Sequence, residues 1–305
     1  GSGKSCTVAS VLQSLFSKPQ EHHARGATFV VFDVNGEYHA ALNASAKEGA
    51  IGVERVVLDG TAAGFRMPHW FLEMAEWELL LQASERTQLP VLRTALGLTS
   101  LFHANTPDAL ALREHFVATC IIECFRGADG DSPVSKFQRV VSLLQKYPTN
   151  DLNMALLNRF NPNFQYGNFS GNNQSAFLDE VRKKLREDAP LPAYNRTPFS
   201  FDELHECLDF AILYEEAHGN RQIRDYCTSM VTRLRSPQER IEYAFLRHEG
   251  ADVDAAVSDL EFLTKIVGLE RAAGESFTKR NQVIIIDLNS VEDEIVELVS
   301  AVIAR

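Results

Sequence analysis

The chain opens with the sequence Gly1-Ser2-Gly3-Lys4-Ser5, which leads into an amphipathic stretch over residues 4–16 and then a short apolar stretch over residues 28–32. A glycine-rich turn, a helix and a strand in this order are typical of an α/β fold with a parallel sheet. The five residues match the second half of the phosphate-binding pattern Gly-x-x-x-x-Gly-Lys-Ser/Thr. A linker ending in Gly-Ser-Gly is the alternative, but it does not explain why Lys4 and Ser5 run directly into a helix.

The phosphate-binding pattern predicts which atoms hold a nucleotide. Backbone N–H groups at the start of a helix surround a phosphate, the lysine reaches the outer phosphates and the hydroxyl binds Mg²⁺. We therefore expect residues 1–5 to bind ATP, with Lys4 on the β- and γ-phosphates and Ser5 as a Mg²⁺ ligand. Cys6 and Thr7 are expected beside the α- and β-phosphates. Because the first glycine of the pattern would precede Gly1, we expect the chain by itself to hold nucleotide poorly and to be inactive.

Composition places the chain in a broad class. It has 305 residues, of which 45% are hydrophobic, enough for a sizeable core. No apolar run approaches the roughly 20 residues that cross a bilayer, and no signal peptide opens the sequence, so we expect a cytoplasmic protein without a membrane partner. The five cysteines are an odd number scattered over a large chain, which fits a reducing compartment. The net charge of -11 neither supports nor excludes nucleic acid, because a local groove can be basic.

Periodicity divides the chain into two kinds of structure. Short β-branched or aromatic runs predict strands at 28–32, 55–58 and 282–286, with 65–67 as a further candidate. Helical spacing dominates from about 71 to 275, interrupted by loops rich in Asn, Gly and Pro at 161–175 and 188–199. A last amphipathic helix is expected over 291–304, capped by Asn289 or Ser290. We predict an α/β core split by a large helical insertion, with the core at 1–70 and 279–305 and the insertion at 71–278.

Acidic residues at strand ends are the remaining candidates for the site. Asp33 and Glu37 follow the strand at 28–32, and in a parallel sheet ligands bind at the carboxyl ends of strands. We expect Asp33 or Glu37 to support the metal shell or the subunit contact. Asp287 follows four apolar residues, so it is either a strand end or a Mg²⁺ ligand. Residues 211–218 also imitate an acidic strand end, but they continue a helical stripe. We therefore predict that 206–216 is helical, with Glu215 and Glu216 at a solvated helix end remote from Lys4.

Several of these motifs together resemble the HerA family of DNA-translocating ATPases. The phosphate loop is followed by a strand that ends in Phe32-Asp33 and continues to Gly36-Glu37-Tyr38, although Val34 and Asn35 depart from the Pro and His often found there. The sequence Ser84-Glu85-Arg86-Thr87-Gln88 is similar to a Ser-x-Arg-Thr-Gln sequence of the family. Ile286-Asp287-Leu288, followed by a helix, is similar to its Ile-Asp-Leu-Ser strand.

The resemblance implies a RecA-like P-loop core, ATP and Mg²⁺ as cofactors, and a homo-hexamer that moves along double-stranded DNA. It also implies a NurA-like nuclease as partner, in DNA end processing or phage defence. The family order puts the Walker B strand after the Ile-Asp-Leu strand, hence beyond Arg305, so no catalytic residue is assigned. Two alternatives remain open from the residues themselves. One is a nucleotide-dependent signalling or scaffold protein, and the other is a motor for secretion or conjugation.

Overall fold

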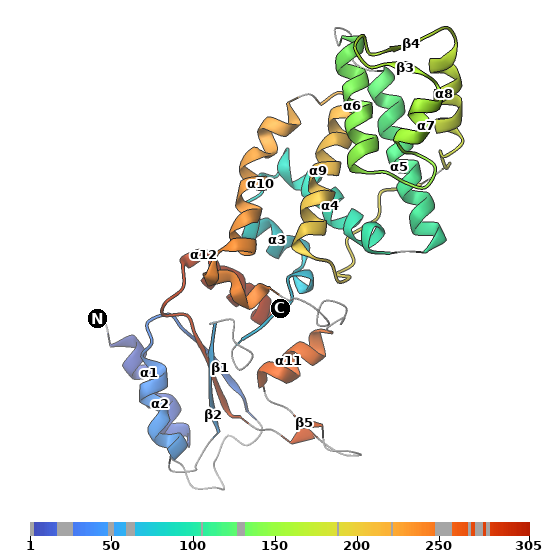
Figure 1. Ribbon diagram of the computed structural model, residues 1–305. Helices are drawn as coiled ribbons and strands as arrows, with labels where there is room; N and C mark the ends of the chain where they lie inside the picture. The colour runs from blue at the N-terminus through green and yellow to red at the C-terminus, as the bar shows by residue number, and fades with distance from the viewer. Residues whose placement is uncertain are drawn as a thin grey trace. The chain divides into compact units, whose positions relative to one another are not determined.

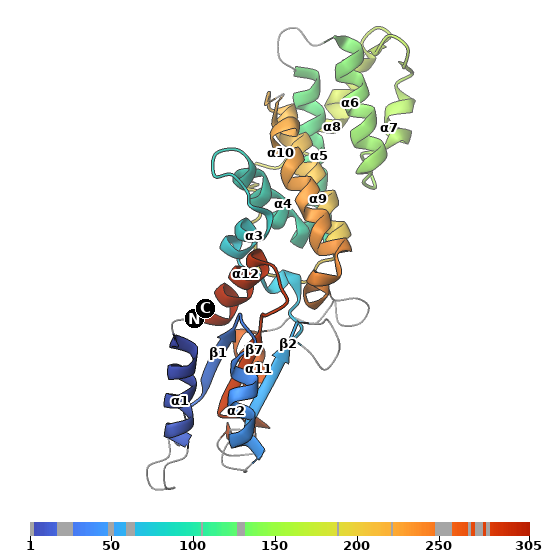
Figure 2. The same cartoon turned by 90° about the vertical axis from the view of Figure 1, so that its left-hand side faces the viewer.

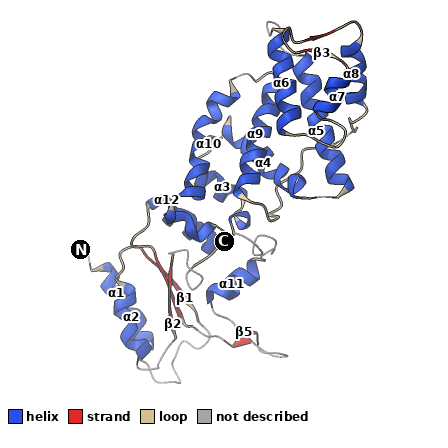
Figure 3. Cartoon of the chain, viewed as in Figure 1, coloured by secondary structure: helices blue, strands red, loops and turns tan. Residues whose placement is uncertain are grey.

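A computed structural model describes the protein over most of its length. The described residues are 3–16, 27–47, 52–58, 65–104, 106–126, 132–187, 189–220, 222–247, 258–267, 270–271, 277–278 and 281–305. The chain divides into two compact units. Unit 1 comprises Gly1–Leu80 and Arg235–Arg305, and unit 2 comprises Leu81–Leu234. The fold is mixed α/β and mostly helical, with one small parallel sheet (Figure 3).

The sheet of unit 1 has three parallel strands in the order β1 (Phe29–Asp33), β7 (Val283–Asp287) and β2 (Val53–Val57). The register pairs Asp33 with Asp287 on one side, and Asp287 with Val57 on the other. The prediction that the strand near residue 282 joins the same parallel sheet as the strand near residue 28 is therefore confirmed. The central strand β7 is fully buried from Val283 to Ile286, as expected for an apolar run between two parallel neighbours.

Two helices cover one face of this sheet, as Figures 1 and 2 show. They are α1 (Lys4–Phe16) and α2 (Tyr38–Lys47). The helix predicted over residues 4–16 is confirmed. The core beneath them is formed by side chains from both helices and all three strands: Leu12, Phe16, Leu42, Val283 and Ile285, with Phe29, Val31, Tyr38 and Val53 packed against them. Alternate residues of β1 and β7 face this core, which is the period of two expected for a strand.

The rest of unit 1 consists of short elements and the last helix. Its first part continues from Phe65 through the 3₁₀ turn η2 (His69–Phe71) into α3 (Met74–Leu81). Its second part follows the end of α10 (Ile223–Glu239), and the elements there are η3 (Ile241–Leu246), α11 (Asp259–Val267), β5 (Glu270–Arg271), β6 (Phe277–Thr278), β7 and α12 (Asp293–Ala304). The strands β5 and β6 pair antiparallel.

Two sequence predictions for unit 1 are wrong. Residues 65–67 do not form a strand, because the N–H of Phe65 donates to Val57 and that of Met67 donates to Phe245, so no single partner strand supports a ladder. The last helix is not capped by Asn289 or Ser290, since the N–H of Asn289 donates to the Asp287 carboxylate in a tight turn. The helix begins three to four residues later, at Asp293.

The described part of unit 2 consists of helices and their connections, with one small hairpin. After the end of α3, its helices are α4 (Gln88–His103), α5 (Pro107–Arg126), α6 (Pro133–Lys146), α7 (Met154–Arg159), α8 (Asn173–Arg182), α9 (Phe201–Ala217) and most of α10. The hairpin consists of β3 (Pro162–Asn163) and β4 (Asn168–Phe169), within the loop predicted at 161–175. No helix among the described residues is long and apolar enough to cross a membrane.

Candidate functional site

The start of α1 is an open helix N-terminus. Gly3 has a φ of +65°, a conformation that favours glycine, and nothing lies within 4 Å of the position that its Cβ would take. The first bonds of the helix run to the Gly3 carbonyl, from the N–H (2.9 Å) and the hydroxyl (3.0 Å) of Thr7. Backbone N–H groups before Thr7 therefore have no acceptor inside the helix, which is the arrangement that binds an anion.

The side chains in this first turn are accessible. Lys4, Cys6 and Thr7 are exposed and Ser5 is partly exposed. A hollow of about 520 Å³ lies along α1 and is lined by residues of that helix that include Cys6 and Thr7. The donor set fits a phosphate group, because it combines backbone N–H groups, one ammonium and two hydroxyls. The predicted ligands Gly1 and Ser2 lie outside the described residues.

The position of α1 relative to the sheet is fixed by packing. Leu12 and Phe16 lie in the core, and the side-chain amide of Gln13 donates to the Ala41 carbonyl of α2. In Figures 1 and 2, α1 starts at the end of the sheet where the strands finish, and it runs back along them. The start of α1 therefore lies on the same edge as the carboxyl ends of β1 and β7, the edge where parallel sheets bind ligands.

Asp33 closes the turn after β1. Its side chain is only 1% exposed, and its carboxylate accepts the N–H groups of Glu37 (3.1 Å) and Tyr38 (2.9 Å), which begin α2. Gly36 within this turn has a φ of +70°, and a Cβ at this position would lie 2.9 Å from the amide nitrogen of Asn289. Glu37, the other candidate site residue after β1, is exposed. The structure thus gives Asp33 a role in holding the turn, while its support of the metal shell stays a prediction.

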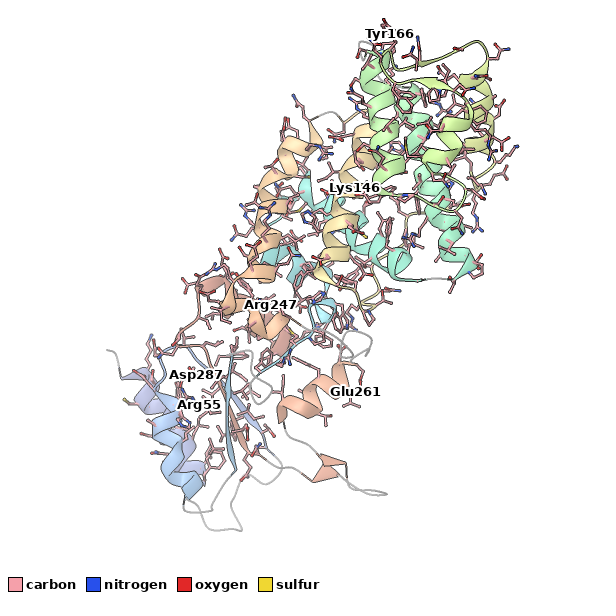
Figure 4. All side chains as sticks on the ribbon, in the orientation of Figure 1. Arg55, Lys146, Tyr166, Arg247, Glu261 and Asp287 are labelled. Atoms are coloured by element: carbon pink, nitrogen blue, oxygen red, sulfur yellow. The ribbon has the colours of Figure 1, made fainter. Side chains whose placement is uncertain are left out.

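Asp287, at the end of the neighbouring strand, forms an ion pair. Its Oδ2 accepts from Nε of Arg55 (2.9 Å) and from the terminal guanidinium nitrogen Nη2 of the same side chain. Burial by itself raises the pKa of Asp287, but the hydrogen bonds from Arg55 and from the N–H of Asn289 outweigh it, so the pKa lies below its usual value. Figure 4 shows Arg55 and Asp287 side by side on unit 1.

Sequence reasoning missed Arg55 and His39 at this edge. Arg55 contacts a residue 232 positions away, and the available signal was the presence of charged residues, Glu54 and Arg55, inside a short strand. His39 lies in the first turn of α2, and its positive form also lowers the pKa of Asp287. Its Nδ1 is buried and has no hydrogen-bond partner. The edge therefore carries basic as well as acidic groups, which suits an anionic ligand better than a bare cation.

The acidic pair at residues 215–216 lies on a helix. Residues 201–217 form α9, whose start is fixed by a capping box between Ser200 and Glu203, so the prediction of a helix is confirmed. Glu216 is less solvated than predicted, because its side chain is 17% exposed and its carboxylate accepts two hydrogen bonds from Arg224 (2.9 and 3.1 Å). The pair belongs to unit 2 and Lys4 to unit 1, so the predicted remoteness from Lys4 stays a prediction.

Comparison with known proteins adds one match. The family model described as helicase HerA, central domain, matches residues 1–187, more than half of the chain. The matched region starts at the phosphate-binding sequence, includes β1 and β2, and extends through unit 2 as far as the end of α8. A search of curated proteins finds no match to the chain.

Proposed function

Because the chain belongs to the HerA helicase family, we propose that it is an ATP-hydrolysing translocase that moves along double-stranded DNA. Family membership by itself indicates a P-loop ATPase that binds nucleotide. The DNA substrate and the Mg²⁺ ion are parts of the proposal. The observation that supports it most directly is the open start of α1, with Gly3 in a left-handed conformation, at the carboxyl edge of a parallel sheet.

The roles of the chain's own residues follow from their chemistry. The backbone from Gly1 to Thr7 would surround the phosphates, Lys4 would neutralise their charge and Ser5 would hold Mg²⁺. Bound ATP supplies the phosphoryl group whose hydrolysis provides the free energy for movement. Asp33 keeps the turn after β1 in place through its two backbone hydrogen bonds, and Glu37 extends from that turn into solvent. Asp287 is the second candidate for the metal shell, and it would have to release Arg55 first.

The resemblance to HerA proteins supports further parts of the proposal. They are a homo-hexameric ring, a cytoplasmic location, a NurA-like nuclease as partner, and a role in DNA end processing or phage defence. No residue of this chain is assigned as the catalytic base. Glu215 and Glu216 are not candidates, because they lie on α9 and Glu216 is held by Arg224.

The substitution Lys4→Ala tests the phosphate-binding site. It is expected to lower ATP turnover by the full protein about 100-fold or more, the size of effect seen when one preorganised donor to a reacting group is removed. The fold should be unchanged, because Lys4 is exposed. The matched control is Lys183→Ala, which removes an exposed lysine of unit 2 that pairs with Glu180. Turnover of the Lys4 variant within twofold of the parent protein would remove the assignment of the phosphate loop.

The DNA substrate is tested by the salt dependence of stimulation. Turnover is expected to rise on addition of double-stranded DNA, and the stimulation should fall steeply between 50 and 200 mM salt, about 10³-fold in affinity for six phosphate contacts. Lys4→Ala should bind the same DNA without turnover. Turnover that DNA never stimulates would favour the signalling or scaffold alternative. Stimulation by an unfolded protein in place of DNA would favour a secretion motor.

A further inference from the structure

The hairpin of unit 2 displays two large aromatic side chains. Between β3 and β4 the chain turns through Phe164 and Tyr166, whose residues are 50% and 60% exposed. Figure 4 shows Tyr166 at the extremity of unit 2 where α6 begins. Two exposed aromatic side chains two positions apart in one turn lie close together on the surface, and neighbouring exposed apolar groups are typical of interaction sites.

The hairpin holds these side chains in a fixed arrangement. The side-chain oxygen of Asn163 accepts the N–H groups of Gln165 (3.1 Å) and Tyr166 (3.2 Å), and the Asn163 carbonyl accepts the N–H of Gly167 (2.9 Å). Gly167 is buried with a φ of +62°, and a Cβ there would lie 2.5 Å from the α-carbon of Val134. The turn therefore packs directly against the first turn of α6, and its conformation does not depend on a ligand.

Buried aromatic rings support the hairpin from below. Phe164 and Phe169 each contact the buried ring of Phe137 at 5.6 Å between centroids, and Phe169 stacks on Phe177 at 5.7 Å. Phe164 is thus anchored along one edge while its remaining surface stays accessible. These contacts explain why the Phe164 ring lies where it does, but they do not explain why Tyr166 is exposed.

The segment that carries the two rings is amide-rich and contains no acidic residue. From residue 152 to residue 178 the sequence contains no Asp or Glu, although the whole chain carries 41 of them. The one charged residue in that stretch is Arg159, which is exposed and forms no ion pair with another described residue. Six amide residues in this segment, within or next to the hairpin in sequence, are exposed: Asn161, Asn163, Gln165, Asn168, Asn172 and Gln174.

We propose that this hairpin binds the bases of an unpaired DNA strand. Aromatic faces stack on bases of any sequence, amide side chains pair with base edges, and one arginine can contact a phosphate. Because the segment has no carboxylate of its own, it adds no repulsion of a polyanion, while the more distant charges of a chain of net charge -11 are screened by salt. The inference goes beyond movement along a duplex and does not depend on ATP hydrolysis.

Fluorescence anisotropy of a labelled mixed-sequence 20-nucleotide single strand tests the proposal with the full protein. Tyr166→Ala is expected to weaken binding about 5- to 100-fold, the loss that accompanies removal of one stacked base. Tyr166→Phe keeps the ring and should bind within twofold of the parent protein. The matched control is Tyr226→Ala, which removes a tyrosine of similar exposure (51%) from α10 and should also bind within twofold.

A strand of the same length with abasic sites separates stacking from charge. The parent protein should bind it at least as weakly as Tyr166→Ala binds the normal strand, because the abasic strand lacks every base that the rings and amides would contact. Arg159→Ala should lower the slope of log affinity against log salt by about 0.7, as expected for one phosphate contact to a single strand. Lys4→Ala should bind the strand like the parent protein, because strand binding does not need ATP hydrolysis. A failure of the ATPase proposal can therefore be told apart from a failure of strand binding. Equal binding of normal and abasic strands, equal binding by Tyr166→Ala, or no binding by the parent protein would each overturn the proposal.

Discussion

Two segments of this protein have almost the same pattern and fold differently. Residues 283–287 are four apolar residues followed by Asp287, and residues 211–215 are four apolar residues followed by Glu215. The first segment is β7, the central strand of the sheet in unit 1. The second is the end of α9 in unit 2. Both could be taken for the acidic strand end of a P-loop ATPase, and only one of them is a strand.

The neighbouring sequence decides between the two outcomes. Residues 283–286 are all β-branched, which favours an extended chain, and both faces of β7 are buried. Residues 211–215 continue a stripe of buried positions at helical spacing from Leu204 and Leu208, and the capping box at Ser200 starts the helix ten residues earlier. A short motif is therefore interpreted reliably only together with the ten residues before it.

Shortening a buried side chain of the central strand β7 gives the largest expected effect. Ile285→Ala should lower the free energy of unfolding by about 2–5 kcal/mol, because Ile285 is fully buried and its loss leaves a cavity. Urea unfolding followed by tryptophan fluorescence reports on unit 1, since both Trp70 and Trp77 belong to it. The control is Val30→Ala on the edge strand β1, at a residue that is 37% exposed, where we expect less than about 1 kcal/mol. Equal losses for the two variants would contradict the central position of β7.

The success with β7, α1 and α9 shows which parts of the fold the sequence specifies. Each has a strong local pattern: a continuous β-branched run, a glycine-rich start, or a capping box with a helical stripe. The helix α2 was not predicted, because Ala, Asn and Ser fill most of it and Leu42 is its one buried residue among those whose burial is described. Its start is set by the carboxylate of Asp33, which accepts hydrogen bonds from the N–H groups of the residues four and five positions later.

The candidate site was predictable only where its residues are close in sequence. The turn at Gly3–Thr7 is a local motif, and the structure gives it the expected open helix start. The contact between Arg55 and Asp287 joins two strands separated by most of the chain. No local pattern indicates which distant residue an arginine in a strand will meet, because the sheet order alone brings the two together. The hairpin at β3–β4 was predicted as a loop for the same reason, since its support comes from Phe137 on α6.

Substitution of Gly36 tests the turn at the acidic edge of unit 1. Gly36→Ala should cost about 2 kcal/mol, because a Cβ at φ +70° is strained and would lie 2.9 Å from the amide nitrogen of Asn289. Gly171→Ala is the control, with a φ of +57° and nothing within 4 Å, and should cost only about 1 kcal/mol of backbone strain. In an Asn289→Ala background the cost at Gly36 should fall to that at Gly171, as measured by urea unfolding. No such coupling would mean that Asn289 does not pack on the turn.

Loss of the cap of α9 is expected to have a smaller effect. Ser200→Ala removes the acceptor of the Glu203 N–H and breaks the capping box, which should cost about 1 kcal/mol. Thermal unfolding followed by circular dichroism measures this loss. Ser175→Ala, at an exposed position inside α8, is the control and should be close to neutral. If Ser200→Ala were as neutral as the control, the capping box would not be what starts the helix that contains residues 211–215.

The smallest expected effect concerns the pH dependence of the Arg55–Asp287 pair. Because the pKa of Asp287 is lowered in the folded protein, the carboxylate stabilises the fold fully above its usual pKa of about 3.9, and this contribution is lost as the pH falls through the folded pKa. The Arg55 side chain is 45% exposed, so solvent screening keeps the contribution of the pair to about 1 kcal/mol or less. Asp287→Asn should therefore be less stable than the parent protein by a constant amount from pH 7 to pH 5. Below about pH 4 the difference should shrink, as measured by urea unfolding with tryptophan fluorescence at each pH. A difference that grows as the pH falls would mean that burial outweighs the hydrogen bonds from Arg55, and that Asp287 is held as a neutral acid at the edge of the sheet rather than as the charged end of β7.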